Sequence, residues 1–376
     1  MQFIDLKKQQ KRIRKNLEFR INKVLNHGQY IMGPEVYELE RNLANSVGVK
    51  HCISCSSGTD ALLLLLMAKN IGPGDSIITT PFTYIATSEV ISLLGATPIF
   101  VDIYKSTYNI DASQIEQAIN FSIKKGLTPK GVIPVDLYGL PARYRIIKQI
   151  AKKFNLFVIE DAAQSFGSSI GKRKACSFGE GAATSFFPAK PLGCYGDGGA
   201  VFTNNDALAK KIRSIRIHGS GETKYDNERI GINGRLDSIQ AAILLEKLTI
   251  FEDEINLRNR VAMRYAEGIS DLYTKPFIPS NYKSSWAQYS ILIPNSIQRK
   301  EIIKKLKEKD IPIMIYYKIP LHLQKVFLSL GYKMGDFPIS EMISRKIISL
   351  PMHPYLDKKS QDKIIEELNK LIETHN

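Results

Sequence analysis

One segment of the chain places a lysine where an enzyme could use its amine. Lys190 lies between Pro188 and Pro191, which keep it out of any regular helix or strand. Glycines follow at positions 196, 198 and 199 and allow the backbone to turn tightly and to approach a ligand. A lone lysine is normally solvated. An apolar, constrained surrounding would instead lower the pKa of the amine and free it to react with a carbonyl.

A carboxylate, Asp161, directly follows the apolar segment 157–160. Because that segment is typical of a strand, we expect Asp161 at the edge of a sheet where ligands bind. A carboxylate at this edge can pair with a protonated ring nitrogen. Gln164, three residues later, would lie on the same face of a following turn. Taken alone, Asp161 fits an ordinary helix N-cap equally well.

A third segment, Ser57-Gly58-Thr59-Asp60, follows the strand-like residues 52–55 and opens a predicted helix over 60–68. The free backbone N–H groups at the start of a helix, together with the Thr59 hydroxyl, suit a phosphate. By itself the segment is more typical of a plain N-cap in which Thr59 or Asp60 satisfies the first amides.

Short apolar runs alternate with helical patterns between about residues 50 and 215. This alternation predicts a mainly parallel sheet with helices on both faces, whose ligands bind at the carboxyl ends of the strands. The predicted strands are 76–80, 98–101, 132–135, 157–160, 184–187 and 200–203. The predicted helices between them are 60–68, 84–94, 112–120, 143–153 and 206–216.

The length of 376 residues predicts more than one hydrophobic core. A long helical pattern over 235–267 is expected to link a large domain, residues 15–250, to a small C-terminal α/β domain, residues 251–376. Residues 289–293 and 313–316 are predicted strands of the small domain, and residues 1–14 are predicted to form an N-terminal arm.

The composition is that of a globular protein with a net charge of +15. Its Lys and Arg residues are spread along the chain beside apolar residues at helical spacing, which is typical of solvated helix faces rather than of a nucleic-acid-binding module. No apolar run approaches the roughly 20 residues that span a membrane. We therefore expect a cytoplasmic protein with neither nucleic acid nor membrane as partner.

Four cysteines do not indicate a disulfide scaffold in a chain of this length. Cys52 and Cys55 form a CxxC pair, but the other two cysteines are not spaced as a second pair and the histidines do not cluster. Buried thiols are the expectation, and no metal site is predicted.

Taken in chain order, the segments around Ser57, Asp161 and Lys190 resemble the DegT/StrS family of pyridoxal phosphate (PLP)-dependent sugar aminotransferases. The resemblance spans nearly the whole chain and includes FIDLK at 3–7, HGQYIMGP at 27–34, PFTYIAT at 81–87 and PMHPYL at 351–356. It implies an α/β fold of the type I PLP-dependent transferases, in a homodimer whose active sites are shared between the subunits.

The resemblance also implies a role for each candidate residue. Lys190 would carry the cofactor and move the proton at the substrate carbon, and Asp161 would pair with the ring nitrogen. The remaining implied contacts are Gln164 with the ring hydroxyl, Tyr84 with the ring face, Gly58, Thr59, Ser185 and Asn233 with the phosphate, and Arg235, Tyr316 and Tyr317 with the substrate. Asn233 and Arg235 are expected to reach in from the partner subunit.

The implied reaction moves an amino group from an amino acid, with glutamate as the expected donor, to a nucleotide-linked 3-keto sugar used for bacterial surface polysaccharide such as lipopolysaccharide O-antigen. A UDP-linked uronate is the first expectation. The alternative is a dTDP- or UDP-linked keto-6-deoxyhexose aminated at C3 or C4. A sugar dehydratase of the same fold has a histidine in place of the lysine, so Lys190 disfavours it. The retained Asp161, Gln164, Ser185 and Lys190 disfavour a non-catalytic regulator.

Some positions depart from the family pattern. Ser57 stands where many relatives have Asn, and Asp136 stands where His or Ser is frequent. In the substrate-facing segment, Tyr316 replaces a His and Lys318 replaces a Pro. The surroundings of the sugar are therefore expected to differ from those in related enzymes.

Overall fold

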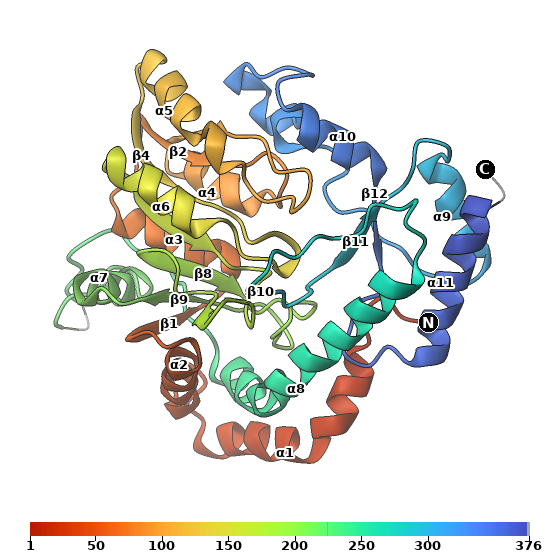
Figure 1. Cartoon of the computed structure of the whole chain (residues 1–376). Helices are drawn as coiled ribbons and strands as arrows, with labels where there is room; N and C mark the ends of the chain where they lie inside the picture. The colour runs from red at the N-terminus through yellow and green to blue at the C-terminus, as the bar shows by residue number, and fades with distance from the viewer. Residues whose placement is uncertain (224, 374–376) are drawn as a thin grey trace.

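The computed structural model describes residues 1–223 and 225–373 of the chain. A seven-stranded sheet with the order β1-β9-β8-β5-β4-β2-β3 forms its centre (Figure 1). Its strands are β1 (His51–Cys55), β2 (Asp75–Thr79), β3 (Thr97–Phe100), β4 (Thr128–Val132), β5 (Phe157–Asp161), β8 (Gly181–Ser185) and β9 (Gly199–Thr203). Strand β9 runs antiparallel to β1 and β8 on either side of it, and the other neighbouring strands described in this sheet pair in parallel. The predicted mainly parallel sheet is confirmed.

Helices cover both faces of this sheet, as expected for parallel strands. On one face pack α3 (Gly58–Ala68), α4 (Ala86–Leu93) and α7 (Asp206–Ile215). On the other pack α2 (Pro34–Val47), α5 (Ile115–Lys124), α6 (Tyr144–Lys153) and the first half of α8 (Ser238–Gly268). Successive strand residues point to opposite faces, so Val158 and Ile159 of β5 belong to different clusters.

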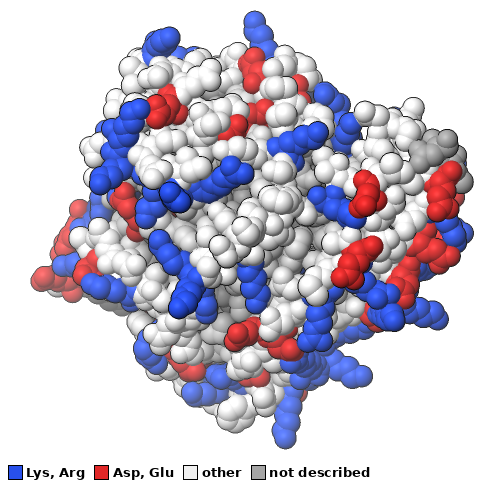
Figure 2. Space-filling model, viewed as in Figure 1, with Lys and Arg blue, Asp and Glu red and all other residues white. Residues whose placement is uncertain are grey.

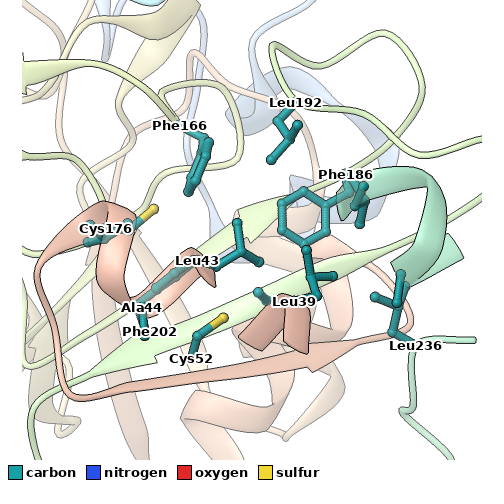
Figure 3. Close-up of a cluster of buried hydrophobic side chains, with 14 of the residues drawn as sticks. Leu39, Leu43, Ala44, Cys52, Phe166, Cys176, Phe186, Leu192, Phe202 and Leu236 are labelled. Carbon is teal, nitrogen blue, oxygen red and sulfur yellow. The ribbon is translucent and has the colours of Figure 1, made fainter. Parts of the chain in front are cut away.

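The cluster beneath β1, β8 and β9 supports the segment that carries Lys190. Leu39 and Leu43 of α2 lie against Cys52, Phe186 and Phe202 (Figure 3). Cys52, Cys55, Cys176 and Cys194 are all buried and free, so the prediction of buried thiols is confirmed.

A second core lies in the C-terminal part of the chain, where the second half of α8 packs against a two-stranded sheet and two helices. These elements are β11 (Tyr289–Leu292), β12 (Ile347–Leu350), α9 (Arg299–Glu308) and α11 (Lys358–Glu373), with α10 (Pro338–Lys346) beside them. The predicted strand over 313–316 is wrong. Met314 makes a single bridge to Ser349, and the left-handed backbone of Tyr317 (φ 61°) then turns the chain away from the sheet.

The N-terminal segment contacts both the first half of α8 and the C-terminal part of the chain. Helix α1 (Leu6–His27) buries Ile13 and Leu17 against Ile243 of α8. Ahead of it, the Phe3 carbonyl accepts a hydrogen bond from the Met352 amide at 3.3 Å. The predicted domain boundaries, after residue 14 and after residue 250, both fall inside continuous helices, α1 and α8. These boundaries therefore stay a prediction.

The remaining elements are short. A small sheet joins β6 (Ser169–Ile170), β7 (Arg173–Lys174) and β10 (Tyr282–Lys283). Short 3-10 helices cover Ala112–Gln114, Leu137–Gly139, Leu321–Leu323 and Lys325–Leu330. Lys and Arg side chains are scattered over the face drawn in Figure 2 among uncharged ones. Within the described residues, no helix combines the length and the apolar character needed to cross a membrane.

Candidate active site

Lys190 lies in the loop that leaves the sheet at the end of β8 and returns as β9. Its backbone N–H donates to the carbonyl of Phe187 at 2.8 Å, which closes a turn. On either side of this turn, Phe186 and Leu192 are buried in the cluster between α2 and the sheet (Figure 3). Because both ends of the turn are anchored, Lys190 has a fixed position although it belongs to no helix or strand.

The surroundings of Lys190 change its acidity. The side chain is half-buried, and its burial lowers the pKa of the amine to about 8, while the charge of Asp161 acts in the opposite direction. A lysine with this pKa has a larger uncharged fraction near neutral pH than a solvated one. It can therefore act as a nucleophile or as a base, as the sequence predicted from its constrained context.

Asp161 ends β5, the strand beside β8, and lies opposite Ala183 in parallel register. Its Oδ2 atom accepts a hydrogen bond from Thr87 Oγ1 at 2.7 Å, and its Oδ1 atom accepts one from the Ala163 amide at 3.1 Å. Burial raises the pKa of Asp161, whereas these two hydrogen bonds and the charge of Lys190 lower it. The carboxylate is thus oriented, desolvated and ready to face a cation.

Gln164 connects the large sheet to the C-terminal part of the chain. Its Oε1 atom accepts from the Tyr138 amide at 2.8 Å, and its Nε2 atom donates to the Tyr317 hydroxyl at 2.8 Å. A side-chain amide carries two donor hydrogens, so one remains for a ligand. Burial raises the pKa of Tyr317, and the nearby charges of Asp161, Tyr316 and Tyr84 add to that rise, whereas the hydrogen bond from Gln164 opposes it.

Tyr316 and Tyr84 lie further out. The ring of Tyr316 is 6.4 Å from that of Phe3 and 6.1 Å from that of Tyr317, between centroids. Tyr84 precedes α4 and is 62% exposed, so its ring is free to cover a ligand.

The predicted phosphate segment lies beside the end of β8. Ser57 is the N-cap of α3, and its hydroxyl accepts from the Asp60 amide at 3.0 Å, so the cap is neither Thr59 nor Asp60. A Cβ atom at Gly58 would lie 2.6 Å from Ser185 Cβ. The helix start that contains Gly58 and Thr59 is therefore in contact with Ser185, and its unpaired N–H groups suit an anion.

Asn233 and Arg235 line a different hollow from Lys190 and Asp161 of the same chain. They line a hollow of about 440 Å³ together with Ser56, Ile31 and Gln240, and among the described residues its walls include neither Lys190 nor Asp161. Asn233 is exposed. The Arg235 Nε atom is buried without a hydrogen-bond partner within the described part of the chain. One chain thus presents these two side chains beside its own phosphate segment rather than at Lys190.

Two supporting groups were not identified from the sequence. Thr87 binds Asp161 from 74 positions away, and no local pattern indicates that pairing. The second is Asp136, which departs from the family pattern and which the sequence did not explain. It is fully buried and accepts hydrogen bonds from Tyr144 Oη at 2.8 Å and Ser165 Oγ at 2.9 Å. Burial raises the pKa of Asp136, which is hydrogen-bonded to the buried Glu160. This pair braces the strand that ends in Asp161.

The assembled groups fit PLP. An amine of lowered pKa, a buried carboxylate for a cationic ring nitrogen and a helix start for a phosphate lie at the carboxyl ends of β5, β8 and β1. A Cβ atom at Gly199 would lie 2.3 Å from the Ser57 carbonyl oxygen, so the backbone around the phosphate segment is closely packed. Over residues 1–223 and 225–373, His, Cys, Asp and Glu form no group of three that could hold a metal ion.

Comparison with known proteins agrees with these features. The model of the DegT/DnrJ/EryC1/StrS aminotransferase family matches residues 11–369. The chain is 48% identical over 363 residues to UDP-2-acetamido-2-deoxy-3-oxo-D-glucuronate aminotransferase of Pseudomonas aeruginosa, an alignment covering 96% of this chain and 97% of the relative.

Solved structures share the fold. A DegT DnrJ EryC1 StrS aminotransferase from Brucella abortus is 50% identical, with a TM-score of 0.95 over 99% of each chain. The PLP form of a putative sugar aminotransferase from Streptococcus pneumoniae is 26% identical, with a TM-score of 0.88 over 96% of this chain and 97% of that chain. The fold expected from the sequence, that of the PLP-dependent transferases, is confirmed.

Proposed function

The chain belongs to the DegT/DnrJ/EryC1/StrS aminotransferase family and is PLP-dependent, and on this premise we propose that it transfers an amino group from glutamate to the keto carbon of a nucleotide-linked sugar. One observation carries the proposal: Lys190, with its pKa lowered to about 8, faces Asp161 across the ends of two adjacent parallel strands. A lysine kept only for solubility would need neither partial burial nor an opposed carboxylate.

The roles of the residues follow from their environments. When bound, PLP supplies an electron sink that stabilises negative charge on the carbon next to the transferred nitrogen. Lys190 can take a proton from that carbon and return one, because a group with a pKa of about 8 acts as both base and acid near neutral pH. Asp161, oriented by Thr87, would keep a ring nitrogen protonated. Gln164 would donate its second amide hydrogen to the ring hydroxyl.

The proposed order is ping-pong, so the donor leaves as a keto acid before the sugar reacts. Gly58, Thr59 and Ser185 would hold the cofactor phosphate at the start of α3. Tyr84 would cover the ring face, and Tyr317, placed by Gln164, would border the substrate with Tyr316 beyond it.

We further propose a homodimer in which Asn233 and Arg235 complete the site of the other copy. Support comes from the exposure of Asn233 and from the separation of its hollow from Lys190 of the same chain. Two exposed apolar side chains lie nearby: Ile31, 48% exposed, lines this hollow, and Ile230, 86% exposed, precedes Asn233 in the chain. Exposed apolar side chains of this kind favour a protein interface.

Mixed dimers test the shared site. Lys190→Ala and Asn233→Ala chains, each inactive alone, should regain activity when co-refolded, because one of the two sites in a mixed dimer then has both wild-type groups. Restoration would not occur if Asn233 served Lys190 of its own chain. Light scattering on the wild-type protein gives the mass, and an active monomer would contradict the proposal.

For the acceptor we propose a UDP-linked 3-oxo sugar with a C6 carboxylate, used in bacterial surface polysaccharide such as O-antigen. The Pseudomonas aeruginosa relative acts by its name on such a sugar. The guanidinium of Arg235, whose Nε atom has no partner within the described residues, offers donors for the carboxylate. A cytoplasmic location belongs to the same proposal and is supported by four free, buried cysteines.

The decisive assay supplies glutamate and either UDP-linked or dTDP-linked keto sugars and identifies the product by mass. Amination of the UDP-linked uronate is expected, with none by Lys190→Ala. Arg235→Ala should raise the KM for this acceptor and leave the glutamate half-reaction unchanged. Amination only of a keto-6-deoxyhexose would redirect the substrate assignment. Turnover of Lys190→Ala at the wild-type rate, or loss of a hydroxyl without gain of an amine, would contradict the aminotransferase assignment.

A further inference from the structure

A second hollow lies along α2, beside the core cluster to which its lining residues Ala44 and Cys52 belong. This groove, of about 670 Å³, is bordered by α2, the start of β1, α7 and the segments 216–222 and 228–229. None of its described lining residues belongs to the candidate active site. Its volume falls in the range typical of small-molecule sites. The groove therefore has to be explained independently of Lys190.

The lining of the groove is strongly cationic. Six Lys and Arg side chains face three Glu side chains. Two of the acids are already paired, Glu40 with Arg216 at 2.6 Å and Glu228 with Arg229 at 2.5 Å. The side chains of Arg41, Lys210 and Arg213, which line the groove, make no hydrogen bond or ion pair with any described residue. Three cations from two helices thus line one hollow without an ion-pair partner among the described residues, and Glu222 is the one carboxylate of the described lining that is not already paired.

The buried end of the groove has an unused donor. Arg216 is only 2% exposed, and its Nη1 atom donates to Glu40 and to the Ser54 carbonyl at 2.8 Å. Its Nε atom is buried and has no partner within the described part of the chain. A buried guanidinium N–H without an acceptor is costly, so an acceptor from a ligand would stabilise it.

We propose that this groove binds a diphosphate-bearing anion at a position separate from the candidate active site. Guanidinium groups match phosphate oxygens through paired hydrogen bonds, and four arginines line the groove. A single carboxylate would satisfy one of these arginines, whereas a diphosphate has enough oxygens for several. Tyr37, half exposed at the same groove, offers a ring face on which a nucleoside base can stack.

Two sources share this chemistry, inorganic diphosphate and a nucleoside diphosphate, and the test separates them. The holoenzyme is titrated calorimetrically at low salt with inorganic diphosphate and with UDP. The groove variant is Arg41→Ala/Arg213→Ala. The matched control is Arg145→Ala/Lys148→Ala on α6, which removes two exposed charges from a helix that does not line the groove. Equal melting temperatures of the two variants confirm that both fold.

We expect saturable diphosphate binding by wild type and control, and binding at least about tenfold weaker by the groove variant, since two charge-assisted contacts are lost. The absence of saturable binding by wild type, or an equal loss in the control, would overturn the proposal and leave an ordinary solvated face. Tyr37→Ala should weaken UDP binding and leave inorganic diphosphate unchanged. Unchanged UDP binding would overturn a nucleoside source.

This proposal and the proposed function can fail separately. With both correct, UDP titrates two sites per chain in wild type and one in the groove variant. If the chain does not use nucleotide sugars, UDP titrates one site in wild type and none in the groove variant. Equal numbers of sites in the two proteins would overturn the groove site, whatever the outcome for the sugar.

Discussion

The Nζ atom of Lys247 donates a 2.5 Å hydrogen bond to the carbonyl oxygen of Gly193, three residues beyond Lys190. Lys247 belongs to α8, is buried and lies 4.2 Å from the centroid of the Tyr195 ring. Burial lowers its pKa to about 8, and the charge of Glu254 opposes that shift. Through this contact, the long helix holds the loop that presents the candidate reactive lysine.

Lys247→Met should loosen that loop, because the Gly193 carbonyl loses its donor while the apolar volume is retained. We expect the free energy of unfolding to fall by about 1–3 kcal/mol and the cofactor to dissociate faster. Urea unfolding and loss of the cofactor absorbance on dialysis measure the two effects. Lys363→Met, on the exposed side of α11, is the control. Wild-type stability and cofactor retention in Lys247→Met would remove its role in positioning Lys190.

Asp161→Asn should lower the pKa of Lys190 below its value of about 8. The Asp161 charge raises this pKa against the effect of burial, so its removal leaves burial unopposed. At pH 7 a larger fraction of the amine would then be uncharged. The check is the pH dependence of acetic anhydride labelling of Lys190 in the cofactor-free protein, followed by mass spectrometry. Asp206→Asn, an exposed carboxylate on α7, should leave the midpoint in place. A midpoint that stays or rises in Asp161→Asn contradicts the pairing.

Gly58→Ala should destabilise the start of α3. The added Cβ atom would lie 2.6 Å from Ser185 Cβ and 3.2 Å from Ser185 Cα, so the end of β8 has to shift. A cost of about 1–3 kcal/mol is expected, with weaker retention of PLP. At Gly72, the nearest atom would be 4.0 Å away, so Gly72→Ala should stay within about 1 kcal/mol of wild type. Thermal unfolding compares the two variants, and equal stability would show that the contact yields easily.

Tyr317→Phe should uncouple Gln164 from the C-terminal part of the chain, because the Gln164 amide loses the hydroxyl that it contacts at 2.8 Å. A double-mutant cycle with Gln164→Ala is expected to give a coupling energy of about 0.5–1.5 kcal/mol in urea unfolding. Tyr316→Phe serves as the comparison, since its hydroxyl is hydrogen-bonded to Gln288 instead. Strict additivity of the two changes would indicate that the contact contributes nothing.

Much of the sheet could be predicted because its signals are local. The apolar runs around Val158 and Val201 and the helical spacing between them depend only on neighbouring residues, and the observed strands and helices lie within a few residues of those predicted. The α3 cap was assigned to Thr59 or Asp60 rather than to Ser57 because serine, threonine and aspartate are all good caps, and only the backbone conformation selects among them. The strand over 313–316 was wrong because the positive φ of Tyr317 has no sequence signature in a non-glycine residue.

The amino-acid sequence alone was enough to single out the candidate residues for the chemistry. Lys190 between two prolines and Asp161 after an apolar run are recognisable because their types and immediate neighbours limit what each can do. The contacts that orient these candidate residues became visible only in the folded chain. Thr87 meets Asp161, Gln164 meets Tyr317 and Lys247 meets Gly193 across 54 to 153 positions of chain. Such pairings arise from how helices and strands pack, and the lowered pKa of Lys190 arises from the water that this packing excludes.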